Sequence, residues 1–231
     1  MKIFINGNFI TLDENKKEIS GLVVNDRGQI KELNKDSILQ EKYKEEIDEI
    51  IDLKNKTIIP GLNDSHLHLF QYGLNKKTID LKNTKSIKEI QNKVRKYIKE
   101  NNINKGQWIQ GKGWDDEQFA KPSFPKAKDL DQITTEYPII LKRSCFHVAT
   151  VNSKALELCG INKNTPNPSG GKIGKKKTGK PNGLFYDTAI EILENTIPQK
   201  SIVESKKILM DAFADMLQKG LTSIQVDDFF N

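Results

Sequence analysis

One stretch of the sequence has residue types and a spacing that could bind a metal ion. His66 and His68 are separated by a single residue, and they are two of only three histidines among 231 residues. Side chains alternate between the two faces of a β-strand, so both imidazoles would project from the same face of a strand. Imidazole nitrogens are common ligands of zinc and of other divalent ions. The spacing therefore predicts half of a metal site, although two neighbouring surface or packed histidines would give the same pattern.

The residues before these histidines extend the pattern. An apolar β-branched pair leads into Pro60-Gly61, which predicts a turn, and Asp64 lies two residues before His66. The combination Pro60-Gly61-x-x-Asp64-x-His66-x-His68 resembles the first-strand signature of the metal-dependent amidohydrolase superfamily. The resemblance implies a (β/α)8 barrel with the metal at its C-terminal mouth. It further implies that His66 and His68 are metal ligands and that Asp64 orients one of the imidazoles.

Two later motifs are similar to the family-3 branch of these enzymes, which includes proteins like N-substituted formamide deformylase. They are Gly111-x-Gly113-Trp114 and Arg143-x-x-x-His147-x-Ala149-x-x-Asn152-Ser153. A short strand followed by a glycine-containing turn predicts that Trp114 is exposed beside carboxylates. Alone, Trp114 would be interpreted as a packed loop residue and His147 as a hydrogen-bonded structural residue. The resemblance instead implies that both side chains line the substrate pocket.

The order of elements predicts an α/β protein in two parts. Residues 1–57 form a β-rich, sandwich-like domain with two hairpins, although any small β-sandwich would show the same periodicity. The first hairpin joins Ile3–Ile5 to Phe9–Leu12 through a type I′ turn at Asn6-Gly7, and the second turns at Asp26–Gln29. By resemblance, residues 58–231 form the first part of a TIM-type barrel, with an inserted loop and hairpin region around 103–182.

Helix signals are clear in four places. Ser86, with Glu89 three residues later, predicts a capped helix that runs to about Glu100. Asn152 predicts the N-cap of a short helix that ends at Gly160. Two further helices are expected at 35–43 and at 203–219, the second followed by a strand at 221–226. A helix, a glycine and then a strand form a connection typical of parallel α/β barrels.

The resemblance also predicts that the chain is incomplete as an enzyme. A (β/α)8 barrel takes about 250 residues, and the later strands, which supply further histidines and a final aspartate base in the family, have no counterpart here. We therefore expect an N-terminal fragment of a hydrolase that acts on a non-peptide, amide-like carbon–nitrogen bond with a divalent metal, for which zinc is the first choice. The alternatives are a catalytically inactive remnant and one half of a split enzyme whose second chain completes the barrel.

The resemblance implies a small-molecule, amide-like substrate, and composition argues against nucleic-acid and membrane partners. The net charge of +6 comes from scattered lysines, and the mean hydropathy is −0.60. This pattern indicates a solvated surface and predicts no nucleic-acid partner. No apolar run reaches membrane-spanning length, so no membrane partner is expected. Two cysteines without a recognisable pairing are typical of reduced thiols, which favours the cytoplasm.

A lysine-rich stretch at 169–181 contains a formal phosphate-loop match, Gly174-x-x-x-x-Gly179-Lys180. The match lacks two features that a phosphate loop needs. Pro181 stands where a serine or threonine would hold magnesium, and no buried strand precedes the loop. A mobile lysine-rich hairpin is the better interpretation. A basic nucleic-acid-binding module at 172–180 is a further alternative, but the stretch lacks the interleaved aromatic residues that would support it.

Overall fold

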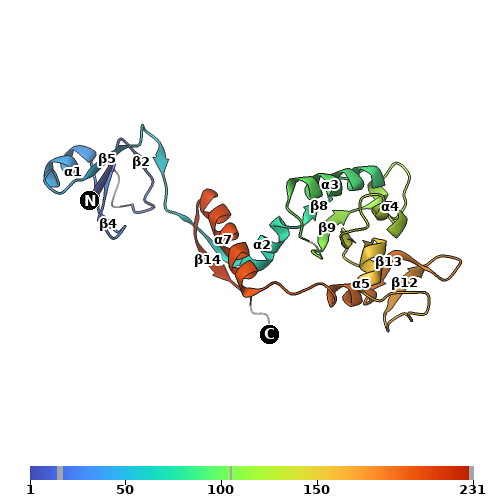
Figure 1. The fold of residues 1–231 in the computed structure, drawn as a ribbon. Coiled ribbons are helices and arrows are strands. Elements are labelled where there is room, and N and C mark those ends of the chain that lie inside the picture. Colours follow the sequence, from blue (N-terminus) through green and yellow to red (C-terminus); the bar gives the residue numbers. More distant parts are fainter. Residues whose placement is uncertain (15–17, 105, 229–231) are drawn as a thin grey trace. The chain divides into compact units, whose positions relative to one another are not determined.

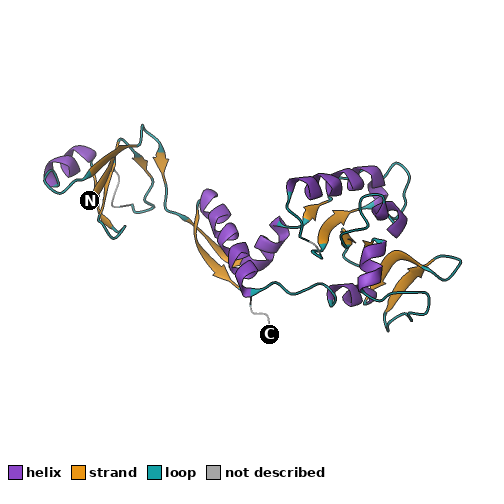
Figure 2. Cartoon of the chain, in the orientation of Figure 1, coloured by secondary structure: helices purple, strands orange, loops and turns teal. Residues whose placement is uncertain are grey.

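The computed structural model describes residues 1–14, 18–104 and 106–228. The chain is a mixed α/β protein with several sheets (Figures 1 and 2). It divides into two compact units, Met1–Leu67 with Met216–Gln225 and His68–Asp215 with Val226–Asn231. Among the described residues, no helix is long and apolar enough to cross a membrane. The domain division expected after residue 57 and the inserted region at 103–182 stay predictions.

The first unit is built on a four-stranded sheet with the order β4-β3-β1-β5. Its strands are β1 (Lys2–Ile5), β3 (Gly21–Val24), β4 (Ile30–Asn34) and β5 (Glu49–Asp52). Helix α1 (Asp36–Lys42) packs on this sheet, and its position confirms the helix expected at 35–43. The small core of the sheet and helix consists of Ile3, Val23, Leu39 and Tyr43.

The first predicted hairpin is wrong, whereas the second is confirmed. Strand β1 is already paired on both edges, with β3 antiparallel and with β5 parallel. The following strand, β2 (Asn8–Phe9), pairs instead with β6 (Thr57–Ile58). A type I′ turn needs a positive φ at both central residues, and Asn6 has a φ of 54° while Gly7 is not in that region. The β3–β4 hairpin forms as expected and turns through Gly28.

The second unit contains a six-stranded sheet with the order β12-β13-β11-β10-β9-β8. Strands β8, β9 and β10 are parallel, and the remaining pairs are antiparallel. The strands are β8 (Ile79–Asp80), β9 (Ile109–Trp114), β10 (Ile139–Arg143), β11 (Val148–Val151), β12 (Gly171–Lys175) and β13 (Pro181–Asp187). The β12–β13 hairpin is the lysine-rich hairpin expected from the sequence.

Helices cover both faces of this sheet. Ile139 and Leu141 join the core under α3 (Ile87–Glu100) and α4 (Ala127–Asp131). Ile140, between them, joins the opposite core, under α5 (Ser153–Leu158) and α6 (Ala189–Glu194). Figure 1 shows α3 running across β8 and β9. The alternation of one strand between two cores explains why β10 is apolar at consecutive positions.

The remaining elements carry or adjoin the candidate site. They are β7 (Leu62–Leu67), α2 (Leu69–Lys76), the short 3-10 helix η1 (Asp116–Gln118), α7 (Ile202–Gln218) and β14 (Leu221–Val226). The predicted helix caps are confirmed, because Ser86 Oγ accepts from Glu89 N at 3.2 Å and Asn152 Oδ1 accepts from Ala155 N at 3.0 Å. Helix α7 is followed by Gly220, which has a φ of 82°.

Asn152 is completely buried and uses its whole amide group. Its Oδ1 accepts from Ala155 N and also from Ile139 N, both at 3.0 Å. Its Nδ2 donates to the carbonyls of Thr134 at 3.0 Å and Tyr137 at 2.9 Å. An amide offers two donor hydrogens and two acceptor lone pairs, so every one of them is satisfied. Asn152 therefore joins the start of β10, the start of α5 and the loop before β10.

Gly183 lets α4 pack directly on β13. It has a φ of 94°, and an added Cβ would lie 2.5 Å from Val151 O and 2.6 Å from Ala127 N. Gly179, in the β12–β13 turn, has a similar φ of 79° but nothing within 4 Å of an added Cβ. The two glycines share a backbone conformation and differ in crowding.

Replacing each glycine by alanine separates backbone strain from steric clash. We expect Gly179→Ala to cost about 1–2 kcal/mol, the strain of a left-handed residue. Gly183→Ala adds overpacking against β11 and α4 and should cost roughly 2–5 kcal/mol in total. Urea unfolding of both variants measures the difference, and equal losses of stability would show that Gly183 is not needed for close packing.

Candidate functional site

Strand β7 carries His66 and is held close to β14 by Gly61. Pro60 and Gly61 lie in a segment without regular structure, not in the predicted turn. An added Cβ on Gly61 would lie 2.0 Å from Thr222 Oγ1, so this position has no room for a side chain. Leu62 N donates to Gly220 O at 2.8 Å and begins the pairing of the two strands. The glycine of the motif therefore serves close strand packing.

His68 lies just beyond the strand. Strand β7 ends at Leu67, and His68 occupies the N-cap position of α2 with φ −92° and ψ 82°. The prediction that both imidazoles project from one face assumed that the strand contains both histidines. The strand contains His66 but ends before His68. The His68 side chain is 53% exposed, and His66 is also exposed.

Asp228 is the carboxylate beside His68. Its Oδ1 lies 3.5 Å from His68 Nδ1, and its Oδ2 accepts from Phe70 N at 2.7 Å. Oδ1 is buried and has no hydrogen-bond partner among the described residues. A buried acceptor left unpaired costs about 1–3 kcal/mol. This oxygen is therefore available to the ring N–H of His68 or to a cation.

Asp64 takes a different position from the one predicted. Its Oδ1 accepts from the backbone N–H of His66 at 3.1 Å, a local bond that shapes the strand. Its predicted role in orienting an imidazole stays a prediction. Sequence reasoning did not select Asp228, although the strand expected at 221–226 leads directly into Asp227-Asp228. The signal that could have identified Asp228 was its position just after a predicted strand. In (β/α)8 barrels the catalytic residues lie at the C-terminal ends of the strands.

The prediction that Trp114 is exposed in a turn is wrong. Trp114 is the last residue of β9 and is fully buried. Its Nε1 donates to Leu141 O at 3.1 Å, and its ring meets Phe124 edge-on at 5.7 Å. A register shift in the β9–β10 pairing directs this side chain into the core. The role of Trp114 in a substrate pocket stays a prediction, and the burial favours the packed interpretation.

His147 lies at the exposed tip of the β10–β11 connection and pairs with Asp187. The His147 side chain is 76% exposed, and its Nδ1 lies 3.1 Å from Asp187 Oδ1. Asp187 N also donates to His147 O at 3.0 Å. Phe146 and Asp187 both have a positive φ, 62° and 50°, which is uncommon outside glycine. Sequence reasoning left Asp187 unassigned, because the contact depends on pairing between β11 and β13 across forty positions.

Comparisons with known proteins agree with this motif set. The model of a family described as "Amidohydrolase family" matches residues 49–230. This chain belongs to the amidohydrolase family. The match starts in β5 and includes the His66–His68 motif, His147 and Asp228.

Named relatives and solved structures support the same family. YtcJ of Bacillus subtilis (strain 168), an amidohydrolase by name, is 35% identical over 229 residues, which cover 99% of this chain and 43% of YtcJ. The N-substituted formamide deformylase of Arthrobacter pascens is 28% identical over 76% of this chain and 33% of its own length. An uncharacterized metal-dependent hydrolase from Pyrococcus furiosus superposes with a TM-score of 0.71 at 28% identity, over 97% of this chain and 44% of that one. This chain thus spans less than half the length of these proteins.

The donor chemistry of this amidohydrolase chain fits a divalent metal in part. Two imidazoles from the His-x-His motif are suitable ligands, and the orphaned Oδ1 of Asp228 lies next to one of them. Within the described ranges, no group of three or more His, Cys, Asp or Glu side chains is placed to hold a metal ion. The residues present therefore fit part of a metal site.

Arg143, from the second family motif, is held by a row of carboxylates. Its Nη2 lies 2.7 Å from Asp115 Oδ1 and 2.9 Å from Glu117 Oε1, and its Nε lies 2.9 Å from Asp116 Oδ1. A hydrogen bond with Cys145 and these carboxylates raise the pKa of the guanidinium. In return, although burial raises the pKa of the Cys145 thiol, hydrogen bonds from Arg143 and from the His147 backbone outweigh it and lower that pKa.

Cys145 is therefore expected to react faster with an alkylating reagent than Cys159. Cys145 is exposed with a lowered pKa, whereas burial raises the pKa of Cys159. The thiolate is the reacting species, so at pH 7 we expect a rate several-fold to roughly ten-fold higher. Iodoacetamide labelling followed by peptide mass spectrometry measures both rates. Arg143→Gln should slow Cys145 and leave Cys159 unchanged, and an unchanged Cys145 rate would contradict the role of Arg143.

Proposed function

We propose that this chain is the N-terminal part of a metal-dependent hydrolase that cleaves a non-peptide, amide-like carbon–nitrogen bond and releases an acid and an amine. The observation that carries the proposal is the His66-x-His68 motif with the Asp228 carboxylate beside His68. The family match and the metal-dependent hydrolase structure from Pyrococcus furiosus support it. The printed name of the Arthrobacter pascens relative supports an N-acyl amine as the substrate class.

His66 and His68 would hold the metal ion, with zinc as the first choice. Such an ion supplies Lewis acidity and lowers the pKa of a water molecule, so that hydrolysis proceeds at neutral pH. Asp228 would accept the Nδ1–H of His68 and thereby leave Nε2 as the ligand nitrogen. Ligand histidines commonly have such a carboxylate on their second nitrogen, because it fixes the ring and raises its basicity. Oδ2 of Asp228 is held by Phe70 N, so its carboxylate is already oriented for this task.

We further propose that the fold is the first part of a (β/α)8 barrel. Strands β7 and β14 would be barrel strands, and the six-stranded sheet, which contains most of the region 103–182, would be an insertion. The remaining ligands and the aspartate base would come from outside residues 1–231, as part of a longer chain or as a second chain. Large apolar side chains exposed on α7 support a covering partner, namely Ile202, Val203, Met210, Phe213 and Leu217.

His147 is proposed as a polar residue of the substrate pocket, oriented by Asp187. Two bonds join this pair, which keeps the Nε2 side of the imidazole outward for a carbonyl or an amine. Trp114 would support the pocket from within the core, where its indole braces β10 through Leu141 O. Two cysteines free of disulfides fit a reducing compartment, and we place the protein in the cytoplasm.

The second candidate is a polypeptide that is inactive alone, either a remnant or one half of a split enzyme. It is favoured by the incomplete ligand set among the described residues. Metal content and turnover distinguish the two. Purified chain should be assayed for bound zinc by mass spectrometry of the metal and for release of amine from N-formyl and N-acetyl amines.

The function is tested first at His66. In any assembly that turns over, His66→Ala should remove metal-dependent activity and lower the metal content well below that of the unchanged chain. His147→Gln serves as a comparison, since it should retain metal and change KM or kcat for the substrate. Unchanged turnover with unchanged metal content in His66→Ala would refute the ligand role. Zinc retained without turnover in the unchanged chain would favour the inactive alternative.

Asp228 gives a second test that does not depend on turnover. Asp228→Asn keeps an oxygen for Phe70 N but loses the charge beside His68, so zinc affinity should fall about 10–100-fold. Asp227→Asn is the matched control, because it makes the same charge change at the preceding, exposed position. Competition with a chromogenic chelator measures both affinities. Equal affinities in the two variants would exclude a role for Asp228 in positioning His68.

A further inference from the structure

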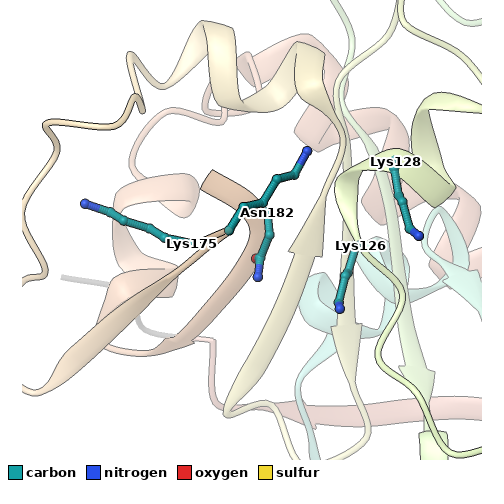
Figure 3. A pocket seen from close by; sticks show the side chains of 5 residues that line it. Lys126, Lys128, Lys175 and Asn182 are labelled. Carbon is teal, nitrogen blue, oxygen red and sulfur yellow. The ribbon is translucent and has the colours of Figure 1, made fainter. Parts of the chain in front are cut away.

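A second candidate site lies within the second unit, between α4 and the β12–β13 hairpin. It is a cavity of about 270 Å³ lined by Lys126, Lys128, Lys175, Lys176 and Asn182 (Figure 3). Asn182 lies near the start of β13 and Asp187 at its end. At about 3.3 Å per strand residue, five residues separate the two by roughly 16 Å. The cavity is therefore distinct from the His147–Asp187 pair and independent of the proposed hydrolase function.

The polar groups that this cavity offers are donors. Oδ1 of Asn182 is occupied by Leu184 N at 2.9 Å, so its Nδ2 is the group left for a ligand. The ammonium groups of Lys126, Lys128 and Lys176 have no ion pair or hydrogen bond within the described part of the chain. No carboxylate is among the lining side chains. A cavity with cationic and amide donors and without acceptors selects an anion.

Lys175 plays a different part in the lining. Its Nζ donates to the carbonyls of Lys163 at 3.1 Å and Thr165 at 2.8 Å. Figure 3 shows its ammonium directed away from the other labelled side chains. Lys175 therefore shapes one wall and anchors the loop beside it, and the anion would contact the other lysines and Asn182.

Three close contacts build the cavity into the fold. Gly183 brings Ala127, the first residue of α4, directly onto β13. Gly174 leaves room for Asn182, since an added Cβ would lie 2.5 Å from its Oδ1. Thr150 Oγ1 donates to Pro125 O at 2.8 Å and holds the segment that enters α4 against β11. The backbone at the N-cap and first turn of α4, which carries Lys126 and Lys128, is thus packed against β13, which carries Asn182.

We propose that this cavity binds a phosphate-bearing small molecule. Like charges gathered in one cavity repel one another, and a dianion relieves that repulsion. A phosphate group presents several acceptor oxygens to donors from different directions, and lysine binds it as a point charge. The phosphate would not be bound by a phosphate loop at 174–180, because these residues form part of the β12–β13 hairpin and its turn. The contacts come instead from side chains on α4, on the hairpin and on β13.

The test uses the whole chain and isothermal titration with inorganic pyrophosphate at 0.15 M salt. We expect saturable binding with one equivalent, and competition by ATP without magnesium if a nucleotide phosphate occupies the same site. Asn182→Asp is the decisive variant, because it keeps the oxygen that accepts from Leu184 N and turns only the free donor into a charged acceptor. It should weaken pyrophosphate binding at least ten-fold, and Lys128→Gln should weaken it several-fold.

Lys172→Gln is the matched control. It lowers the net charge by one, as Asn182→Asp does, on an exposed residue of β12 outside the cavity lining. Its pyrophosphate affinity should equal that of the unchanged chain. Three results would overturn the proposal: the absence of saturable binding, equal weakening by Lys172→Gln and Asn182→Asp, or binding of DNA or RNA alone with a steep salt dependence. Circular dichroism confirms that each variant is folded.

Discussion

The second unit depends on one buried amide. Asn152 satisfies all four of its hydrogen-bonding positions inside the protein. Loss of this side chain would leave several buried backbone groups unpaired, at about 1–3 kcal/mol each. Asn152 joins the start of β10 to the end of β11, and the antiparallel register of the two strands brings them together toward their connection at residues 144–147. That connection carries Cys145 and His147, so the positions of both side chains depend on a buried amide outside the loop.

Strand β13 also holds the β10–β11 connection in place. Its two ends differ in charge, because a carboxylate lies at one end and a lysine-lined cavity at the other. At its C-terminal end, Asp187 meets His147 in a strained backbone conformation. At its N-terminal end, Gly183 admits α4 and Asn182 faces a cavity lined by lysines. The register between β11 and β13 contributes to both ends. Val148 opposite Tyr186 places His147 next to Asp187, and Thr150, which lies opposite Leu184, holds Pro125 through a hydrogen bond. A slip of one residue would disrupt both ends at once.

Local signals in the sequence predicted local structure well. The caps at Ser86 and Asn152, the glycine after α7 and the turn at Gly28 each act within a few residues, so periodicity and cap chemistry suffice to find them. The failures involve contacts between distant segments. The partners of β1 could not be predicted from the Asn-Gly step, because β3 and β5 occupy both of its edges and β5 pairs with it from 47 residues further along the chain, Glu49 opposite Lys2. Trp114 was placed in a turn because the register shift between β9 and β10 leaves no mark in the sequence.

In the candidate metal site, too, sequence reasoning found the local feature and missed the contact between distant segments. The imidazoles were found because their spacing is local, whereas Asp228 reaches Phe70 from 158 positions further along the chain. The orienting role of Asp64 is implied by the resemblance, because Asp64 belongs to the same local motif as the histidines. The role of Asp64 stays a prediction, and the structure adds Asp228 as a second carboxylate near the motif. Each carboxylate accepts a backbone N–H through one oxygen, Asp64 from His66 and Asp228 from Phe70. The second oxygen of Asp228 is buried, has no hydrogen-bond donor among the described residues and lies 3.5 Å from His68 Nδ1. An unpaired buried carboxylate oxygen is tolerated where a positive charge or a polarised N–H completes it, and the ring of His68 is the group that the structure places beside this oxygen.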